Sequence, residues 1–99
     1  MSCVFEFGPF RLCPTTRVLQ QHDGDVALGS RAFDILVALV ESNGNVLTRR
    51  ELMAIAWPGL VVEESNVRVQ VANLRKVLGC GRDGARYIAS IAGRGYCFA

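Results

Sequence analysis

The segment E-S-N-V-R-V-Q-V-A-N-L-R-K-V-L, residues 64–78, separates into three faces when its residues are placed at helical intervals. Four apolar side chains form one stripe: Val67, Val71, Leu74 and Leu78. Arg68 and Arg75, seven residues apart, share one flank. The other flank carries the amides Asn66, Gln70 and Asn73, with Val69 and Lys76 further round. We therefore predict an amphipathic helix over residues 64–78 whose apolar stripe lies in the core.

The amide flank indicates a binding surface. Asn and Gln present a donor and an acceptor together, which matches the N6/N7 edge of adenine, and Val69 can contact a thymine methyl group. A helix that is only solvated more often carries Glu and Lys at such positions, because amides are neither strong helix formers nor strong solubilisers. The alternative is an ordinary surface helix, since two or three amides are common there.

The preceding segment, T-R-R-E-L-M-A-I-A-W-P at residues 48–58, predicts a short helix of about ten residues. Thr48 and Glu51 form a Thr-x-x-Glu capping box, and Pro58 enforces the stop. Arg49 and Arg50 lie in the first turn, where backbone N–H groups favour an anion, so a bound phosphate is one reason for them. The alternative is that both point to solvent.

Residues 31–42 predict a helix that is apolar on most sides and therefore buried, with Ser30 as its N-cap and Asn43-Gly44 as a left-handed C-terminal cap. Before it, extended pieces at 4–7, 10–13, 17–20 and 26–28 alternate with turn signals. This spacing predicts a small antiparallel sheet within residues 1–29.

At the C-terminal end, R-Y-I-A-S-I-A-G-R-G-Y-C-F at residues 86–98 predicts a β-hairpin. Gly93 and Gly95 flank Arg94, and glycine allows the positive φ angles of a tight turn. We therefore expect Arg94 to stand out from the hairpin tip. The alternative is an exposed arginine that only aids solubility.

Length and composition restrict the class of protein. At 99 residues, the chain predicts one domain over 1–99 of ordinary globular composition. Net charge is −2 through residue 47 and +4 from residue 48, and ten of the eleven basic residues are arginines, which suit contacts with phosphate or guanine. With no apolar run of membrane-spanning length and no signal peptide pattern, the sequence predicts a soluble, cytoplasmic domain without membrane contact.

An enzyme, a metal site and a bound cofactor are all disfavoured. Four scattered cysteines and one histidine give no close ligand pairs, so reduced thiols packed as small hydrophobes are expected. His22 lies in a predicted turn without a nucleophile to assist. The G-C-G-R-D-G stretch at 79–84 follows a helix and lacks the Lys-Ser/Thr ending of a phosphate-binding loop.

The predicted order of elements is a sheet, three helices over 30–78 and a hairpin with a basic tip. In this order, the chain resembles the winged helix-turn-helix DNA-binding domain of OmpR/PhoB-type bacterial transcription regulators. The resemblance covers residues 4–98 and rests on five pieces. These are F-x-F-G-P-F-x-L at 5–12, L-G-S-R-A-F-D-I-L at 28–36, L-T-R-R-E-L with A-W-P at 47–58, V-x-V-x-V-A-N-L-R-K-V-L at 67–78 and R-Y-I-x-x-I-x-G-R-G-Y-x-F at 86–98.

The resemblance implies an α+β fold in which helix 64–78 enters the major groove of double-stranded DNA and hairpin 86–98, the wing, reaches the minor groove. Residues facing base edges would be Asn66, Val69, Gln70 and Asn73. Phosphate contacts would be Arg49, Arg50, Arg68, Arg75 and Lys76, with Arg94 on the wing. The rival function is a winged helix that binds protein or RNA without DNA specificity.

Two positions depart from the family pattern. Ala92 stands where many members carry the arginine of the wing, and Asn73 replaces an arginine found in some relatives. Both changes bear on which DNA is bound. The resemblance further implies that loop 57–63 can contact RNA polymerase, unless Trp57, Leu60 and Val61 merely cover the core, and that two copies can bind DNA in tandem.

If Met1 is the natural start, the domain is N-terminal, an arrangement that resembles membrane-anchored or large multidomain regulators.

Overall fold

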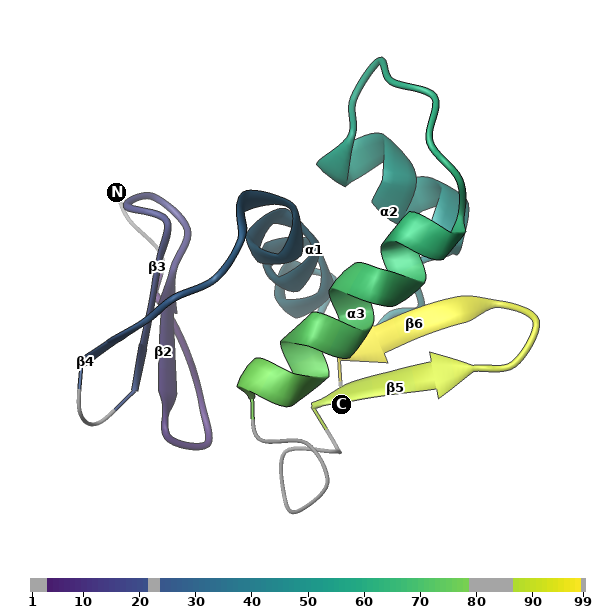
Figure 1. The fold of residues 1–99 in the computed structure, drawn as a ribbon. Coiled ribbons are helices and arrows are strands. Elements are labelled where there is room, and N and C mark those ends of the chain that lie inside the picture. The colour runs from purple at the N-terminus through teal and green to yellow at the C-terminus, as the bar shows by residue number, and fades with distance from the viewer. Residues whose placement is uncertain (1–3, 22–23, 79–86, 99) are drawn as a thin grey trace.

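A computed structural model describes residues 4–21, 24–78 and 87–98 (Figure 1). A four-stranded antiparallel sheet comes first, in the order β1 (Phe5–Phe7), β2 (Phe10–Cys13), β3 (Val18–Gln21) and β4 (Gly24–Val26). Three helices follow: α1 (Ser30–Glu41), α2 (Arg49–Ala56) and α3 (Ser65–Val77). The hairpin of β5 (Ile88–Ile91) and β6 (Gly95–Phe98) ends the chain. The predicted α+β winged helix-turn-helix fold is confirmed.

The sheet differs from the prediction at its second half. Arg17 adopts φ +57° in the turn before β3, so β3 begins one residue later than expected. Strand β4 covers 24–26 instead of 26–28, because Gly24, at φ +130°, already pairs with Gln21. The expected turn residues His22 and Asp23 lie outside the described residues.

Helix α1 lies at the centre, between the sheet on one side and the other helices and the hairpin on the other (Figure 1). Its buried residues join those of the sheet, the other helices and the hairpin in one core, as expected for a helix that is apolar on most sides. Its C-terminal end confirms the left-handed cap, with Asn43 at φ +57° and Gly44 at φ +89°.

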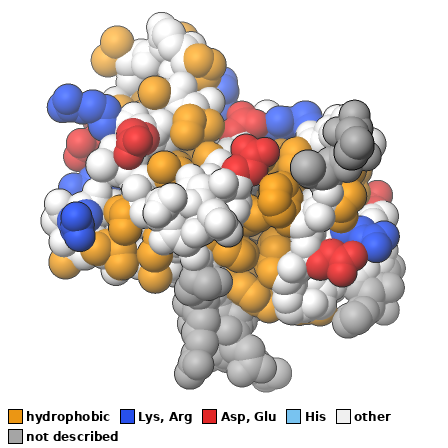
Figure 2. All heavy atoms as spheres, turned by 180° about the vertical axis from the view of Figure 1, so that it is seen from behind, with side chains coloured by type: hydrophobic (Ala, Val, Ile, Leu, Met, Phe, Trp, Pro, Cys, Tyr) orange, Lys and Arg blue, Asp and Glu red, His pale blue; other side chains and the backbone are white. Residues whose placement is uncertain are grey.

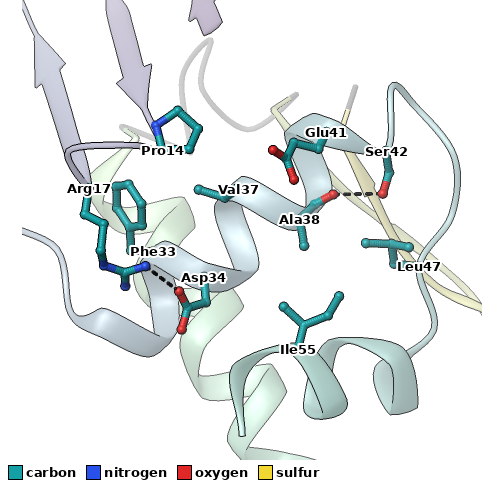
Figure 3. A pocket seen from close by; sticks show the side chains of 10 residues that line it. All are labelled: Pro14, Arg17, Phe33, Asp34, Val37, Ala38, Glu41, Ser42, Leu47 and Ile55. Carbon is teal, nitrogen blue, oxygen red and sulfur yellow. Dashed lines mark hydrogen bonds and ion pairs between the residues drawn. The ribbon is translucent and has the colours of Figure 1, made fainter. Parts of the chain in front are cut away.

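The predicted N-cap of α1 is wrong. Gly29 is the N-cap, and Ser30 is already the first helical residue, without a side-chain capping bond. The Ser30 hydroxyl instead accepts a hydrogen bond from Arg17 at 3.2 Å. Arg17 also pairs with Asp34 at 2.8 Å and lies over the Phe33 ring (Figure 3). The Ser30 hydroxyl, which the sequence predicted to cap the start of α1, thus binds Arg17 from the β2–β3 turn instead.

The capping box predicted at the start of α2 is confirmed. The Glu51 amide donates to the Thr48 hydroxyl at 3.0 Å, and the Thr48 amide donates to the Glu51 carboxylate at 2.9 Å. The helix has eight residues, fewer than expected, because Trp57 leaves the helical conformation and turns into the core. Arg31 donates to the Ala56 carbonyl and lies beside the Trp57 ring, which fixes the end of α2 against α1.

Helix α3 is one residue shorter at each end than predicted, with Glu64 and Leu78 as its caps. The predicted stripe of Val67, Val71, Leu74 and Leu78 is confirmed, because these side chains are 0–3% exposed. The flanks of α3 are consequently fixed in orientation by the buried stripe.

A short antiparallel bridge attaches the hairpin to the start of α2. Leu47 and Tyr96 exchange two backbone hydrogen bonds, at 2.8 and 2.9 Å. Next to them, a Cβ on Gly95 would lie 2.8 Å from the Leu47 carbonyl carbon and from the Thr48 Cα, and would overlap the Leu47 carbonyl oxygen. Gly95 therefore serves close packing of two backbones as well as the turn expected from its positive φ.

We predict that Gly95→Ala destabilises the fold by about 3 kcal/mol or more, because the clash is with backbone atoms that cannot rotate away. Gly93→Ala is the matched control: Gly93 also has positive φ, +72°, but a Cβ there meets open space, so about 1 kcal/mol of strain is expected. Urea unfolding followed by circular dichroism measures both. Equal losses would contradict a packing role specific to Gly95.

The β2–β3 turn lowers the pKa of one cysteine, Cys13. Hydrogen bonds from the Thr16 hydroxyl and backbone lower the pKa of the Cys13 thiol below its ordinary value, and nearby Arg11 acts in the same direction. Cys13 and Cys97 are both free thiols, whereas Cys3 and Cys80 lie outside the described residues. Among residues 4–21, 24–78 and 87–98, no three metal-ligating side chains gather.

We predict that iodoacetamide alkylates Cys13 faster than Cys97 at pH 7.5, because the lowered pKa leaves more reactive thiolate. Peptide mass spectrometry of briefly treated folded protein gives both rates. Thr16→Val, which keeps the shape but removes the hydroxyl, should slow Cys13 and leave Cys97 unchanged. A Cys13 rate that is insensitive to Thr16→Val would contradict the assigned cause.

Candidate nucleic-acid interface

The amide flank of α3 points to solvent. Asn66, Val69 and Asn73 are exposed, Val69 by 55%, and Gln70 is half-buried. The Asn66 side-chain amide donates to the Glu63 carbonyl at 3.2 Å, which holds it at the start of the helix. The wing turn lies on the same side of the molecule as the N-terminal end of α3 (Figure 1). The structure thus places the four expected base-reading residues along α3, outside its buried stripe, with the wing turn on the side where the helix begins.

Four of the expected cations are exposed around this helix: Arg50, Arg68, Lys76 and Arg94. Arg49 is half-buried, and its Nε lies 3.6 Å from a carboxylate oxygen of Glu64, which joins the first turn of α2 to the start of α3. Arg94 lies in the wing turn, where its backbone N–H donates to the Ile91 carbonyl at 2.9 Å. These positions give a discontinuous set of cations from α2, α3 and the wing.

Arg75 differs from the other cations of α3. Its Nε and Nη2 donate to the Ile88 carbonyl at 3.3 and 3.1 Å, and Nη2 donates to the Ser90 hydroxyl at 2.7 Å. The guanidinium also lies 6.0 Å from the centre of the Tyr96 ring. We expected a phosphate-facing side chain beside Arg68, and the structure instead turns Arg75 onto the wing. Helical periodicity could not reveal this, because the acceptors belong to a strand 13 to 15 residues further along the chain.

The loop between α2 and α3 has a buried base and an exposed tip. Trp57 is buried, as expected of a core cover, whereas Leu60 is 58% exposed and Val61 is fully exposed. The loop stands away from the helices in Figure 1. The alternative in which all three merely cover the core therefore holds for Trp57 and not for Leu60 and Val61.

Figure 2 shows the opposite face of the molecule, which carries hydrophobic side chains over much of its area, with both acidic and basic side chains among them. A groove of about 440 Å³ lies between α1, α2 and the β2–β3 turn, with Val37, Leu47 and Ile55 on its walls (Figure 3). The Asp34 carboxylate in this groove is held by Arg17, so this ion pair ties the sheet to α1. No helix of the described segments is long and apolar enough to span a membrane.

Comparisons with known proteins identify the family of this chain. Residues 23–98 match the family "Transcriptional regulatory protein, C terminal". The transcriptional activator CadC of Escherichia coli K12 is 30% identical over 94 residues, which are 94% of this chain and 18% of CadC. A cholera toxin homolog transcriptional activator of Vibrio parahaemolyticus is 34% identical over 73 residues, 72% of this chain and 25% of that protein. The chain therefore spans only a minor part of these relatives.

Solved structures match nearly the whole chain. The DNA-binding domain of E. coli CadC superposes with a TM-score of 0.83 at 25% identity, covering 100% of this chain and 92% of that one. The Klebsiella pneumoniae RstA DNA-binding domain, in complex with the RstA box, gives 0.81 at 26% identity, covering 97% and 96%. The matched family is one of DNA-binding domains of transcriptional regulators and not a family of enzymes, as the sequence predicted. The chain belongs to the OmpR/PhoB-type family of DNA-binding domains of bacterial transcriptional regulators.

Proposed function

We propose that this chain reads a specific sequence in double-stranded DNA, with α3 in the major groove and the β5–β6 wing at the minor groove. The observation that carries the proposal is the set of amides and Val69 on the solvent side of α3, opposite a fully buried stripe. A B-DNA major groove admits one α-helix, and the exposed flank of α3 offers the donors, acceptors and methyl groups that distinguish base pairs there.

The exposed cations fit the same orientation. Arg50 on α2, together with Arg68 and Lys76 on α3, would contact phosphates on either side of the groove, which position the helix without reading sequence. Arg49 would add a phosphate contact beside the backbone N–H groups of α2, with Glu64 holding its side chain toward α3. Arg94 would enter the minor groove, where a narrow groove concentrates negative potential.

Selection from a pool of random duplexes at two salt concentrations tests the proposal. A sequence-specific reader enriches a motif, and its affinity falls by about 0.9 log units per tenfold salt for each phosphate contacted. Salt-sensitive retention without a motif would show DNA binding without sequence reading. No retention at low salt would contradict the proposal and favour the rival protein-binding function.

We predict that Gln70→Ala and Asn73→Ala each cost about 1–3 kcal/mol on the selected duplex and much less on unrelated duplexes, because a bidentate base contact is lost. Arg50→Ala and Lys76→Ala should weaken all duplexes alike and reduce the salt slope by about one each. Arg11→Ala is the control, since Arg11 is an exposed cation paired with Glu6 on the distant sheet. Fluorescence anisotropy measures each variant. A uniform loss with Asn73→Ala would contradict base reading by that residue.

The proposal extends to RNA polymerase as a partner of loop 57–63. Leu60 and Val61 are exposed although apolar, which is the character of the centre of a protein interface. We predict that Leu60→Ser with Val61→Ser leaves stability and DNA affinity within about 0.5 kcal/mol of the parent, because neither side chain supports the core. The same change should reduce recruitment of RNA polymerase holoenzyme to a DNA fragment that carries the selected site.

The matched control for the loop is Val4→Ser, which removes an exposed apolar side chain just before β1 of the sheet and not in the loop. Gel-shift of the ternary complex, with equal occupancy of DNA by each variant, measures recruitment. Recruitment that is equal for the loop variant and the parent would contradict a polymerase contact through this loop.

Assembly and location complete the proposal. The domain would act in the cytoplasm, where bacterial DNA lies, within a longer regulator like those it matches. Two copies would bind in tandem on adjacent sites, one helical turn apart. Titration of a duplex with two copies of the selected motif tests this: cooperative filling supports tandem binding, and independent filling contradicts it.

A further inference from the structure

Arg75 connects the outer edge of the wing to α3. Strand β6 pairs with β5 on one side and bridges to Leu47 on the other, whereas β5 presents its remaining edge toward α3. There the Ile88 carbonyl accepts hydrogen bonds from two N–H groups of Arg75. The hydroxyl of Ser90, two residues further along the same strand, accepts a third hydrogen bond from Arg75. One guanidinium therefore contacts two successive edge positions of β5.

The geometry requires arginine. A planar guanidinium donates from Nε and Nη2 in a fixed fork and can lie over the Tyr96 ring at the same time. A lysine ammonium is a single point on a flexible stem, so it can retain the charge but cannot reproduce this set of contacts. The half-buried side chain thus holds β5 at a defined position relative to α3.

We propose that Arg75 is a positioning residue that sets the wing relative to α3 and thereby places Arg94 on the DNA. This inference rests on the proposed DNA-binding function. Beyond Ser90, β5 ends at Ile91, whose carbonyl accepts the backbone N–H of Arg94. A shift of β5 is therefore transmitted to the turn that carries Arg94, while the base-reading flank of α3 stays in place on its buried stripe.

A double-mutant cycle on the selected duplex tests the inference. Arg75→Lys keeps the charge at position 75 but should weaken binding roughly tenfold and lower the salt slope as much as Arg94→Ala does, because Arg94 is displaced from the DNA. Arg94→Ala should weaken binding to a similar extent. In the Arg94→Ala background, Arg75→Lys should cost less than about twofold further, since both changes remove the same contact.

The controls distinguish positioning from direct contact. Lys76 is an exposed neighbour of Arg75 on α3, so the fold-loss in affinity caused by Lys76→Ala should multiply with the fold-loss caused by Arg94→Ala. Ser90→Ala removes an Arg75 acceptor without touching any cation, so it should reproduce part of the Arg75→Lys loss and add nothing to it. The inference would be overturned if Arg75→Lys bound DNA as tightly as the parent, if Arg94→Ala had no effect on affinity, or if the fold-losses of the two changes simply multiplied in the double variant.

A measurement without DNA separates this inference from the proposed function. Residual dipolar couplings of backbone amides report the orientation of β5 relative to α3 in the folded domain. Arg75→Lys should change that orientation, whereas Lys76→Ala should not. An unchanged orientation overturns positioning by Arg75, while failure of the parent to retain any duplex would instead overturn the proposed function.

Discussion

The backbone contact between β6 and the start of α2 is the constraint on which the arrangement of the wing, α2 and α3 depends, because it joins segments about half the chain apart. Leu47 exchanges two hydrogen bonds with Tyr96, and Gly95 leaves no room for a side chain between the two backbones. The adjacent Thr48 caps α2, so one short stretch both orients the wing and begins the second helix. Arg49 then continues the connection to Glu64 at the start of α3.

The arginines of the described segments divide by location into those that hold the fold and those that face solvent. Arg17 and Arg31 attach α1 to the sheet and to the end of α2, through oxygen acceptors and aromatic rings. Within the described segments, Arg50, Arg68 and Arg94 make no ion pair and remain exposed. Charge distribution therefore indicates a binding surface only after the structural arginines have been set apart.

Periodicity and capping chemistry predicted the elements, because both depend on residues within one or two helical turns. The stripe on α3 and the Thr48 capping box are local patterns of this kind. The N-cap role predicted for Ser30 was wrong, and the contacts of Arg75 and the close packing at Gly95 were not foreseen, because the partners of these residues lie far along the chain. Sequence patterns give the residue types of a site, whereas tertiary packing decides which of them remain free to bind.

The position of the wing cation follows from the same packing. Residue 92, alanine here, directly follows β5, whereas Arg94 directly precedes Gly95, the residue held against Leu47 and Thr48. A cation at 94 is therefore carried beside the most constrained point of the hairpin, and its backbone is also bonded to the end of β5. Its location consequently depends on both attachments of the wing, through Leu47 on one strand and Arg75 on the other. An arginine at position 94, where the wing turn meets β6, is thus positioned by the start of α2 as well as by α3.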